Sequence, residues 1–128
     1  MKGVLSPQPD YKPTVRALVL AALPGVVSLV LYYSLALHMW LALGRWPTNI
    51  GERGFPPHLV SHVHLEHYYF GALIGFGIFV WPLALLICGV VARWERYVIP
   101  LTLFALFFLV SCLLRTYAPA EFQTWWMD

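Results

Sequence analysis

Three long runs of apolar residues dominate the chain, and short polar segments separate them. The first run covers residues 15–44 almost without interruption, the second covers residues 69–92, and the third covers residues 97–115. A helix of about 17–25 apolar residues is long enough to cross a hydrocarbon layer about 30 Å thick. The pattern therefore predicts an all-α integral membrane protein with three transmembrane helices.

The segments beside these runs contain the residues that end helices. Residues 1–14 are polar and rich in proline, and residues 45–68 form a loop rich in Gly, Pro and His that can include a helical extension back to Pro57. Residues 93–96 make only a short turn, so the second and third helices are expected to form a tight antiparallel hairpin. Residues 116–128 are rich in Tyr and Trp, which favour the headgroup region, and predict an aromatic interfacial tail.

The composition of the chain agrees with a membrane location. Of its 128 residues, 60% are hydrophobic and 11% are charged, against about 45–50% and about 25% in soluble domains, and the mean hydropathy is +0.70. Eight Lys and Arg with six Asp and Glu cannot cover the surface of a soluble domain. These values exclude a soluble enzyme, a disordered tail and a disulfide-stapled module. Without a basic stripe, nucleic acid is not an expected partner.

The basic residues near the ends of the runs predict the orientation. One side of the predicted membrane carries five of them, namely Lys2, Lys12, Arg16, Arg93 and Arg96. The other side carries Arg45, Arg53 and Arg115. Because cytoplasmic loops carry an excess of Lys and Arg, we expect the N-terminus to be cytoplasmic and the C-terminus to be outside.

Small residues recur four positions apart in two of the predicted helices. Such ridges let helix backbones approach closely in a bilayer, where packing drives association. The candidate packing residues are Ala17, Ala21 and Gly25 in the first helix and Gly71 and Gly75 in the second. Three helices bury little of one another's surface, so we expect the chain to assemble with itself or with other membrane subunits.

Histidines form the main chemical feature of the sequence. Four of the five lie within ten residues, and the predicted topology brings His38 to the same side of the membrane. Neutral imidazole is the commonest metal ligand, so a metal or haem site is one hypothesis. The candidate ligands are His38, His58, His62, His64, His67 and Glu66.

Helical geometry limits this hypothesis. At about 100° per residue, His58 and His62 share one face of a helix while His64 and His67 point roughly the opposite way. A complete site would therefore need either His58 and His62 with Glu66, or His64 with His67, completed from another segment or subunit. His38 is the best candidate to complete it. Two other roles fit the same pattern, namely histidines that hydrogen-bond to headgroups and water, and a pH sensor.

No catalytic motif accompanies the histidines. The pattern H-E-x-x-H is absent, the inverted form H-x-x-E-H fails at Val63, and no P-loop, dinucleotide fingerprint or G-x-S-x-G occurs. No carboxylate is expected inside a span. In size and number of spans the chain resembles the three-helix anchor subunits of respiratory complexes such as succinate dehydrogenase and fumarate reductase. Their haem-ligand pattern does not match residues 61–71, so the resemblance implies the architecture alone.

These observations favour a non-catalytic accessory or assembly subunit of a membrane complex, or a homo-oligomer. The alternative is a membrane anchor or subunit with a His-based metal, haem or quinone site at the outer face. A third hypothesis is an interfacial enzyme that acts on lipids with His64 or His67 as the base beside Glu66.

Overall fold

The structure is a computed structural model that describes residue 12, residues 14–47 and residues 54–127, and this part of the chain is helical with no strand. The elements in order are α1 (Val15–Leu43), α2 (Pro57–Gly75), η1 (Phe76–Val80), α3 (Trp81–Val90), η2 (Ala92–Tyr97), α4 (Val98–Arg115) and α5 (Ala120–Met127). Within the described ranges, three continuous helical stretches are long and apolar enough to cross a membrane: Val15–Leu43, Pro57–Val90 and Ala92–Arg115. The all-helical prediction with three such helices is thereby confirmed.

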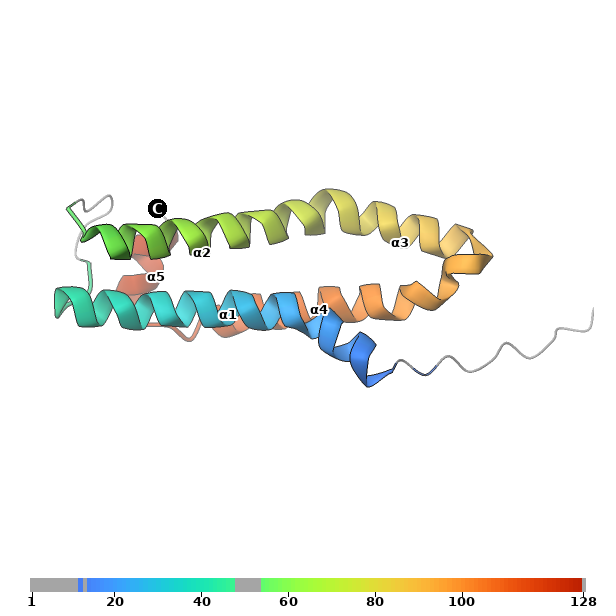
Figure 1. The fold of residues 1–128 in the computed structure, drawn as a ribbon, viewed down its shortest axis with the longest axis horizontal. Coiled ribbons are helices and arrows are strands. Elements are labelled where there is room, and N and C mark those ends of the chain that lie inside the picture. Colours follow the sequence, from blue (N-terminus) through green and yellow to red (C-terminus); the bar gives the residue numbers. More distant parts are fainter. Residues whose placement is uncertain (1–11, 13, 48–53, 128) are drawn as a thin grey trace, which may run out of the picture.

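Helix α1 begins and ends at residues that cap it. The Thr14 side chain accepts a hydrogen bond from the Ala17 N–H at 3.3 Å, which satisfies one of the free donors of the first turn. At the other end Gly44 has φ of 66°, a left-handed conformation that glycine adopts without strain. Pro24 lies inside the helix and removes one backbone donor. Figure 1 shows α1 bending in its N-terminal part.

The second long stretch begins at Pro57, twelve residues before the apolar run at residue 69, and so includes the helical extension that the sequence allowed. Proline suits the first helical position because its missing N–H would have no partner there. Farther along, the five-residue π-helical turn η1 ends two residues before Pro82, which cannot donate to the preceding turn. Figure 1 shows this α2–η1–α3 rod bowing outward from α1 and α4.

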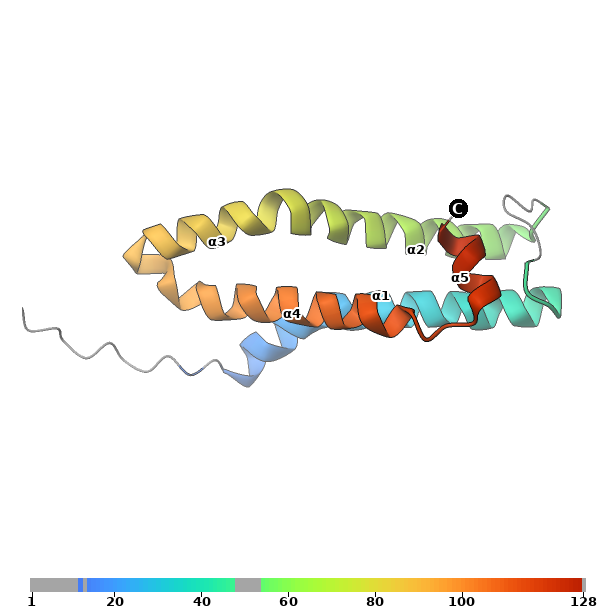
Figure 2. The same cartoon turned by 180° about the vertical axis from the view of Figure 1, so that it is seen from behind.

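The helices meet along α1. Helix α1 packs against both α4 and α2, and α3 contacts α4 beside η2, where the chain reverses direction. Helix α4 ends well before the far end of α1. The chain then continues into α5, which lies transverse to α1 and α2 and bridges them, as Figure 2 shows from behind.

The buried core lies at the end of the molecule that α5 covers. It consists of Tyr32, Leu35, Ala36, Met39, Leu59, Ala118 and Phe122. The expected interfacial tail thus forms a helix whose Phe122 is fully buried, with its ring 5.1 Å from that of Tyr32. Trp125 and Trp126 are partly buried against the same core. The difference arises because the apolar side of α5 finds partners in α1 and α2, which are distant in sequence.

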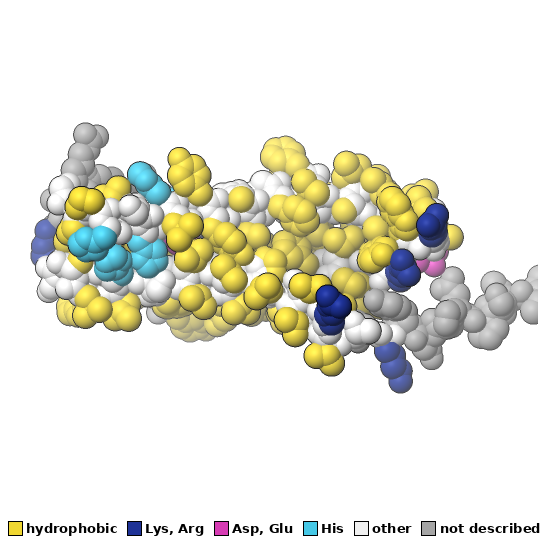
Figure 3. Space-filling model, in the orientation of Figure 1, with side chains coloured by type: hydrophobic (Ala, Val, Ile, Leu, Met, Phe, Trp, Pro, Cys, Tyr) yellow, Lys and Arg dark blue, Asp and Glu magenta, His cyan; other side chains and the backbone are white. Residues whose placement is uncertain are grey.

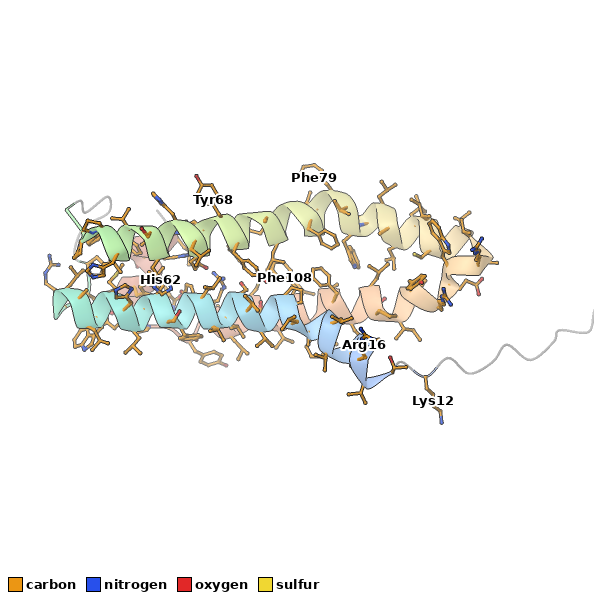
Figure 4. The ribbon with its side chains drawn as sticks, viewed as in Figure 1. Lys12, Arg16, His62, Tyr68, Phe79 and Phe108 are labelled. Atoms are coloured by element: carbon orange, nitrogen blue, oxygen red, sulfur yellow. The ribbon has the colours of Figure 1, made fainter. Side chains whose placement is uncertain are left out.

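Apolar side chains are spread over much of the face that Figure 3 shows. Tyr68 and Phe79 point away from the bundle (Figure 4) and are 79% and 74% exposed. Ile78 and Leu86 on the same rod are also mostly exposed. Exposing so much apolar side-chain surface to water is unfavourable, whereas exposing it to the hydrocarbon of a bilayer is not. The surface is therefore typical of helices that face lipid.

The two ridges of small residues have different surroundings. Ala21 and Gly25 are buried, and a Cβ atom at Gly25 would lie 3.1 Å from the carbonyl oxygen of Phe107. Ala17 lies half-buried at the same side of α1. At Gly71 and Gly75 an added Cβ would meet no atom of the described chain within 4 Å. The ridge of α1 thus brings α1 and α4 together, while no described segment covers the ridge of α2.

Candidate functional site

A buried ion pair joins the helices where α4 ends. Arg115 and Glu66 are 6% and 1% exposed, and Nη2 of Arg115 donates to Oε1 of Glu66 at 2.8 Å. The same nitrogen donates to Oγ of Ser28 at 2.6 Å, and the indole N–H of Trp126 donates to Oε2 of Glu66 at 2.6 Å. We call Ser28, Glu66, Arg115 and Trp126 the Arg115 junction. It connects α1, α2, α4 and α5 through one pair of opposite charges.

Aromatic rings surround the guanidinium of this pair. Its central carbon lies 3.8 Å from the ring centre of Phe70, 4.5 Å from that of Tyr32 and 5.0 Å from that of Trp126. Nε and Nη1 of Arg115 are buried, and neither has a hydrogen-bond partner in the part of the chain that the structure describes. The negative faces of the rings attract the cation, which offsets part of its lost hydration.

Local sequence explains why these side chains converge. Glu66 and Phe70 are four residues apart, so both lie on the face of α2 that is turned toward α1 and α5. Ser28 follows by one helical turn Gly25, where the backbone of α1 lies close to that of α4 at Phe107. Arg115 ends α4, and a positive charge there is favourable for the helix dipole.

The Arg115 junction was not predicted. The sequence placed Arg115 at the point where the third run leaves the membrane and expected no carboxylate inside a span, and Glu66 was considered only as a metal ligand or a helper base. In the structure each carboxylate oxygen of Glu66 accepts one hydrogen bond, Oε1 from Arg115 and Oε2 from Trp126. The spacing of four between His62, Glu66 and Phe70 is the signal that would have placed Glu66 on the inner face of α2.

A second polar group lies farther from η2, between α1 and α2. His38 of α1 contacts two histidines of α2: Nδ1 of His38 is 3.0 Å from Nδ1 of His62, and the His38 ring stacks on His58 with 5.1 Å between ring centres. We call His38, His58 and His62 the histidine triplet. Figure 4 shows His62 between the two helices, and Figure 3 shows histidines gathered at this end.

Hydrogen bonding assigns the protons of two of these imidazoles in their neutral form. The Ser34 hydroxyl donates to the Leu31 carbonyl at 3.0 Å, so its oxygen accepts from Nε2–H of His62 at 3.2 Å. Nδ1 of His62 then carries the lone pair, and Nδ1–H of His38 donates to it. The two rings are thus partners of each other, and a metal that used both Nδ1 atoms would first have to displace this proton.

The other histidines lie apart from the triplet. His64 is exposed and contacts the edge of Tyr68, while His67 hydrogen-bonds to the Val63 carbonyl and packs on Trp126. Nδ1 of His67 also lies 3.6 Å from Oε2 of Glu66. The helix thus separates His58 and His62 from His64 and His67, as its period requires. Among the residues that the structure describes, no three His, Cys, Asp or Glu side chains are arranged to hold a metal ion.

Comparison of the chain with protein-family models, with curated proteins and with solved structures gives no match.

Proposed function

We propose that this chain is an integral membrane protein that crosses the bilayer three times and acts, without catalysis, by assembling with other helices. The α2–η1–α3 rod and α4 would form the second and third spans, joined as a hairpin at η2. In this arrangement the N-terminus is cytoplasmic, the C-terminus is outside, and α5 with the histidine triplet lies at the outer face. The excess of Lys and Arg near η2 and the start of α1 supports this orientation.

The ridge of Gly71 and Gly75 is the observation that carries the assembly role. Both glycines lie on a long apolar helix, and an added Cβ at either would meet no described atom of this chain within 4 Å. A Gly-x-x-x-Gly ridge stabilises contact with a second helix by letting the backbones approach. This ridge is available to a helix of another subunit or of a second copy.

The polar groups also support a role without catalysis. The Glu66 carboxylate binds Arg115 and Trp126, and His62 binds His38 and Ser34. Each of these groups therefore completes an internal contact instead of presenting a free acid, base or nucleophile to a substrate.

Replacing both ridge glycines is expected to abolish assembly. The full chain is first shown to stay in the membrane during alkaline carbonate extraction and is then purified in mild detergent. Sedimentation measures the size of the purified assembly, and the proteins that co-migrate with the chain are identified. The G71L/G75L variant should lose the oligomer or the bound subunits, because leucine side chains hold the second backbone away.

Gly89→Leu is the matched control, since an added Cβ at Gly89 also meets no described atom within 4 Å. It should keep the assembly of the parent chain. Unchanged size and unchanged co-migrating proteins in G71L/G75L would refute the assembly role, and release of the parent chain by carbonate would refute the membrane location.

The histidine triplet favours a second candidate function, a subunit that binds a metal, haem or quinone at the outer face. Three imidazoles from two helices lie in contact there. If this function is correct, protein purified from native membranes should carry stoichiometric metal, show a haem Soret band or release a quinone into organic solvent. Loss of that signal is expected in His62→Ala and not in His64→Ala, because His64 lies outside the triplet. Purified protein that carries no metal, no haem and no extractable quinone would refute this second function.

A further inference from the structure

An apolar cavity of about 610 Å³ lies near the η2 end of the molecule, away from the Arg115 junction and the histidine triplet. Its walls come from the first half of α1, from η1 and α3, from the end of η2 and from the start of α4. The lining includes Leu20, Ala21, Phe76, Ala84, Tyr97 and Phe104. The phenol of Tyr97 is the polar exception among these six side chains.

The cavity follows from the way the helices diverge. The α2–η1–α3 rod bows away from α1 and α4 (Figures 1 and 2), and small residues face the space, with Ala21 on one side and Ala84 on the other. Its volume falls within the range of about 300–1,000 Å³ that is typical of small-molecule sites. A helix with its side chains is about 10–12 Å across and is too wide for this cavity, whereas a single hydrocarbon chain is narrow enough to enter it.

Basic residues lie beside this cavity. Arg16 directly precedes the lining residue Ala17, and Arg96 donates to the hydroxyl of the lining residue Tyr97 at 3.0 Å. Arg93 belongs to the same η2 turn, as does the acidic Glu95. Three arginines against one glutamate leave two net positive charges (3 − 1 = 2). Figure 3 shows this gathering of basic side chains, and Figure 4 labels Arg16 beside the start of α1.

We infer that the cavity binds one anionic phospholipid of the bilayer, with an acyl chain between α1 and α3 and the phosphate at Arg16 and Arg96. The apolar lining selects a hydrocarbon chain, and the charges beside it select a negative headgroup. The Tyr97 hydroxyl accepts from Arg96, so its own O–H is left to donate to a phosphate oxygen. This inference rests on the proposed membrane location and is independent of the assembly role.

Competition between two lipids tests the inference. The full chain in dodecyl maltoside is mixed with equal amounts of phosphatidylglycerol and phosphatidylcholine that carry the same oleoyl chains, and bound lipid is counted by native mass spectrometry. Because each basic residue near the surface attracts anionic lipid by about 1 kcal/mol, we expect about a fivefold preference for phosphatidylglycerol per arginine. In R16Q/R96Q the preference should fall toward unity while phosphatidylcholine binding persists.

Filling the cavity should remove both lipids. Ala84→Trp places a large ring in the space, and Leu101→Trp is a second filling variant from the opposite wall if the first does not keep its helical circular dichroism. Arg45→Gln, at the other end of α1, is the charge control and should bind like the parent chain. Equal retention of the two lipids by the parent chain, or parental retention in a folded filling variant, would overturn the inference. Either result leaves the carbonate-extraction test of the membrane location unaffected.

Discussion

Arg115→Met is expected to destabilise the folded chain by about 3–5 kcal/mol, because a buried carboxylate then loses its counter-ion. Glu66 is 1% exposed. Without the guanidinium, its carboxylate has as remaining partners the indole N–H of Trp126 and the more distant imidazole of His67. Ser28 loses its partner as well. The loss is measured as earlier unfolding of the full chain in mixed dodecyl maltoside and SDS micelles, followed by circular dichroism.

Removing both charges should restore much of this stability. In E66Q/R115M the amide oxygen of glutamine can still accept from Trp126, and no unpaired charge is buried. We expect the double variant to recover at least half of the loss. Arg93→Met, at an exposed position of η2, should change the stability by less than about 0.5 kcal/mol. Parental stability of R115M, or a double variant no more stable than R115M, would show that the ion pair does not hold the junction together.

Gly25→Leu is expected to cost about 3 kcal/mol and to separate α1 from α4 locally. Even a Cβ atom at this position would lie 3.1 Å from the carbonyl oxygen of Phe107 and 3.3 Å from its carbonyl carbon. Backbone atoms cannot adopt another rotamer as a flexible side chain can. A larger residue at this position must therefore shift one of the two helices. The same micelle unfolding assay measures the effect, and Gly25→Ala should show a smaller loss of about 1 kcal/mol.

Gly89→Leu is the control for this series, because its Cβ has open space within the described part of the chain. Gly89→Leu should unfold at the same SDS fraction as the parent chain. The Gly25 variants should also weaken the Arg115 junction, since Ser28 lies one turn farther along α1. A Gly25→Leu variant as stable as Gly89→Leu would mean that α1 and α4 do not approach as closely as the structure places them.

The long helices could be predicted from the sequence, and their ends only in part. The first apolar run and the stop at Gly44 match α1 because both are local properties of hydropathy and backbone preference. Pro57 was identified as a possible start of α2 because proline suits the first helical position, but hydropathy alone did not decide whether the helix begins there. Residues 57–68 are rich in His and Tyr, and they become helical together with partners in α1 and α5 that lie far away in sequence.

The grouping of the histidines was predicted in part, and their use as metal ligands stays a prediction. Helical spacing separated His58 and His62 from His64 and His67, and His38 was the best candidate to complete a site with either pair. The structure brings His38, His58 and His62 into contact. Glu66 belongs to the same face of α2 and was grouped with the histidines as a ligand, but it pairs with Arg115. A single sequence does not show which of two possible polar partners a carboxylate binds in the folded protein.

The sequence by itself determined the all-helical architecture and the number of apolar helices, because hydropathy, helix caps and proline positions act over neighbouring residues. Only the tertiary structure decided which polar groups would meet. Arg115 reaches Ser28 across 87 positions and Glu66 across 49, and Trp126 reaches Glu66 across 60. Such contacts depend on where α4 ends and how α5 folds back, and a buried charge is stable there because its partner arrives from another helix.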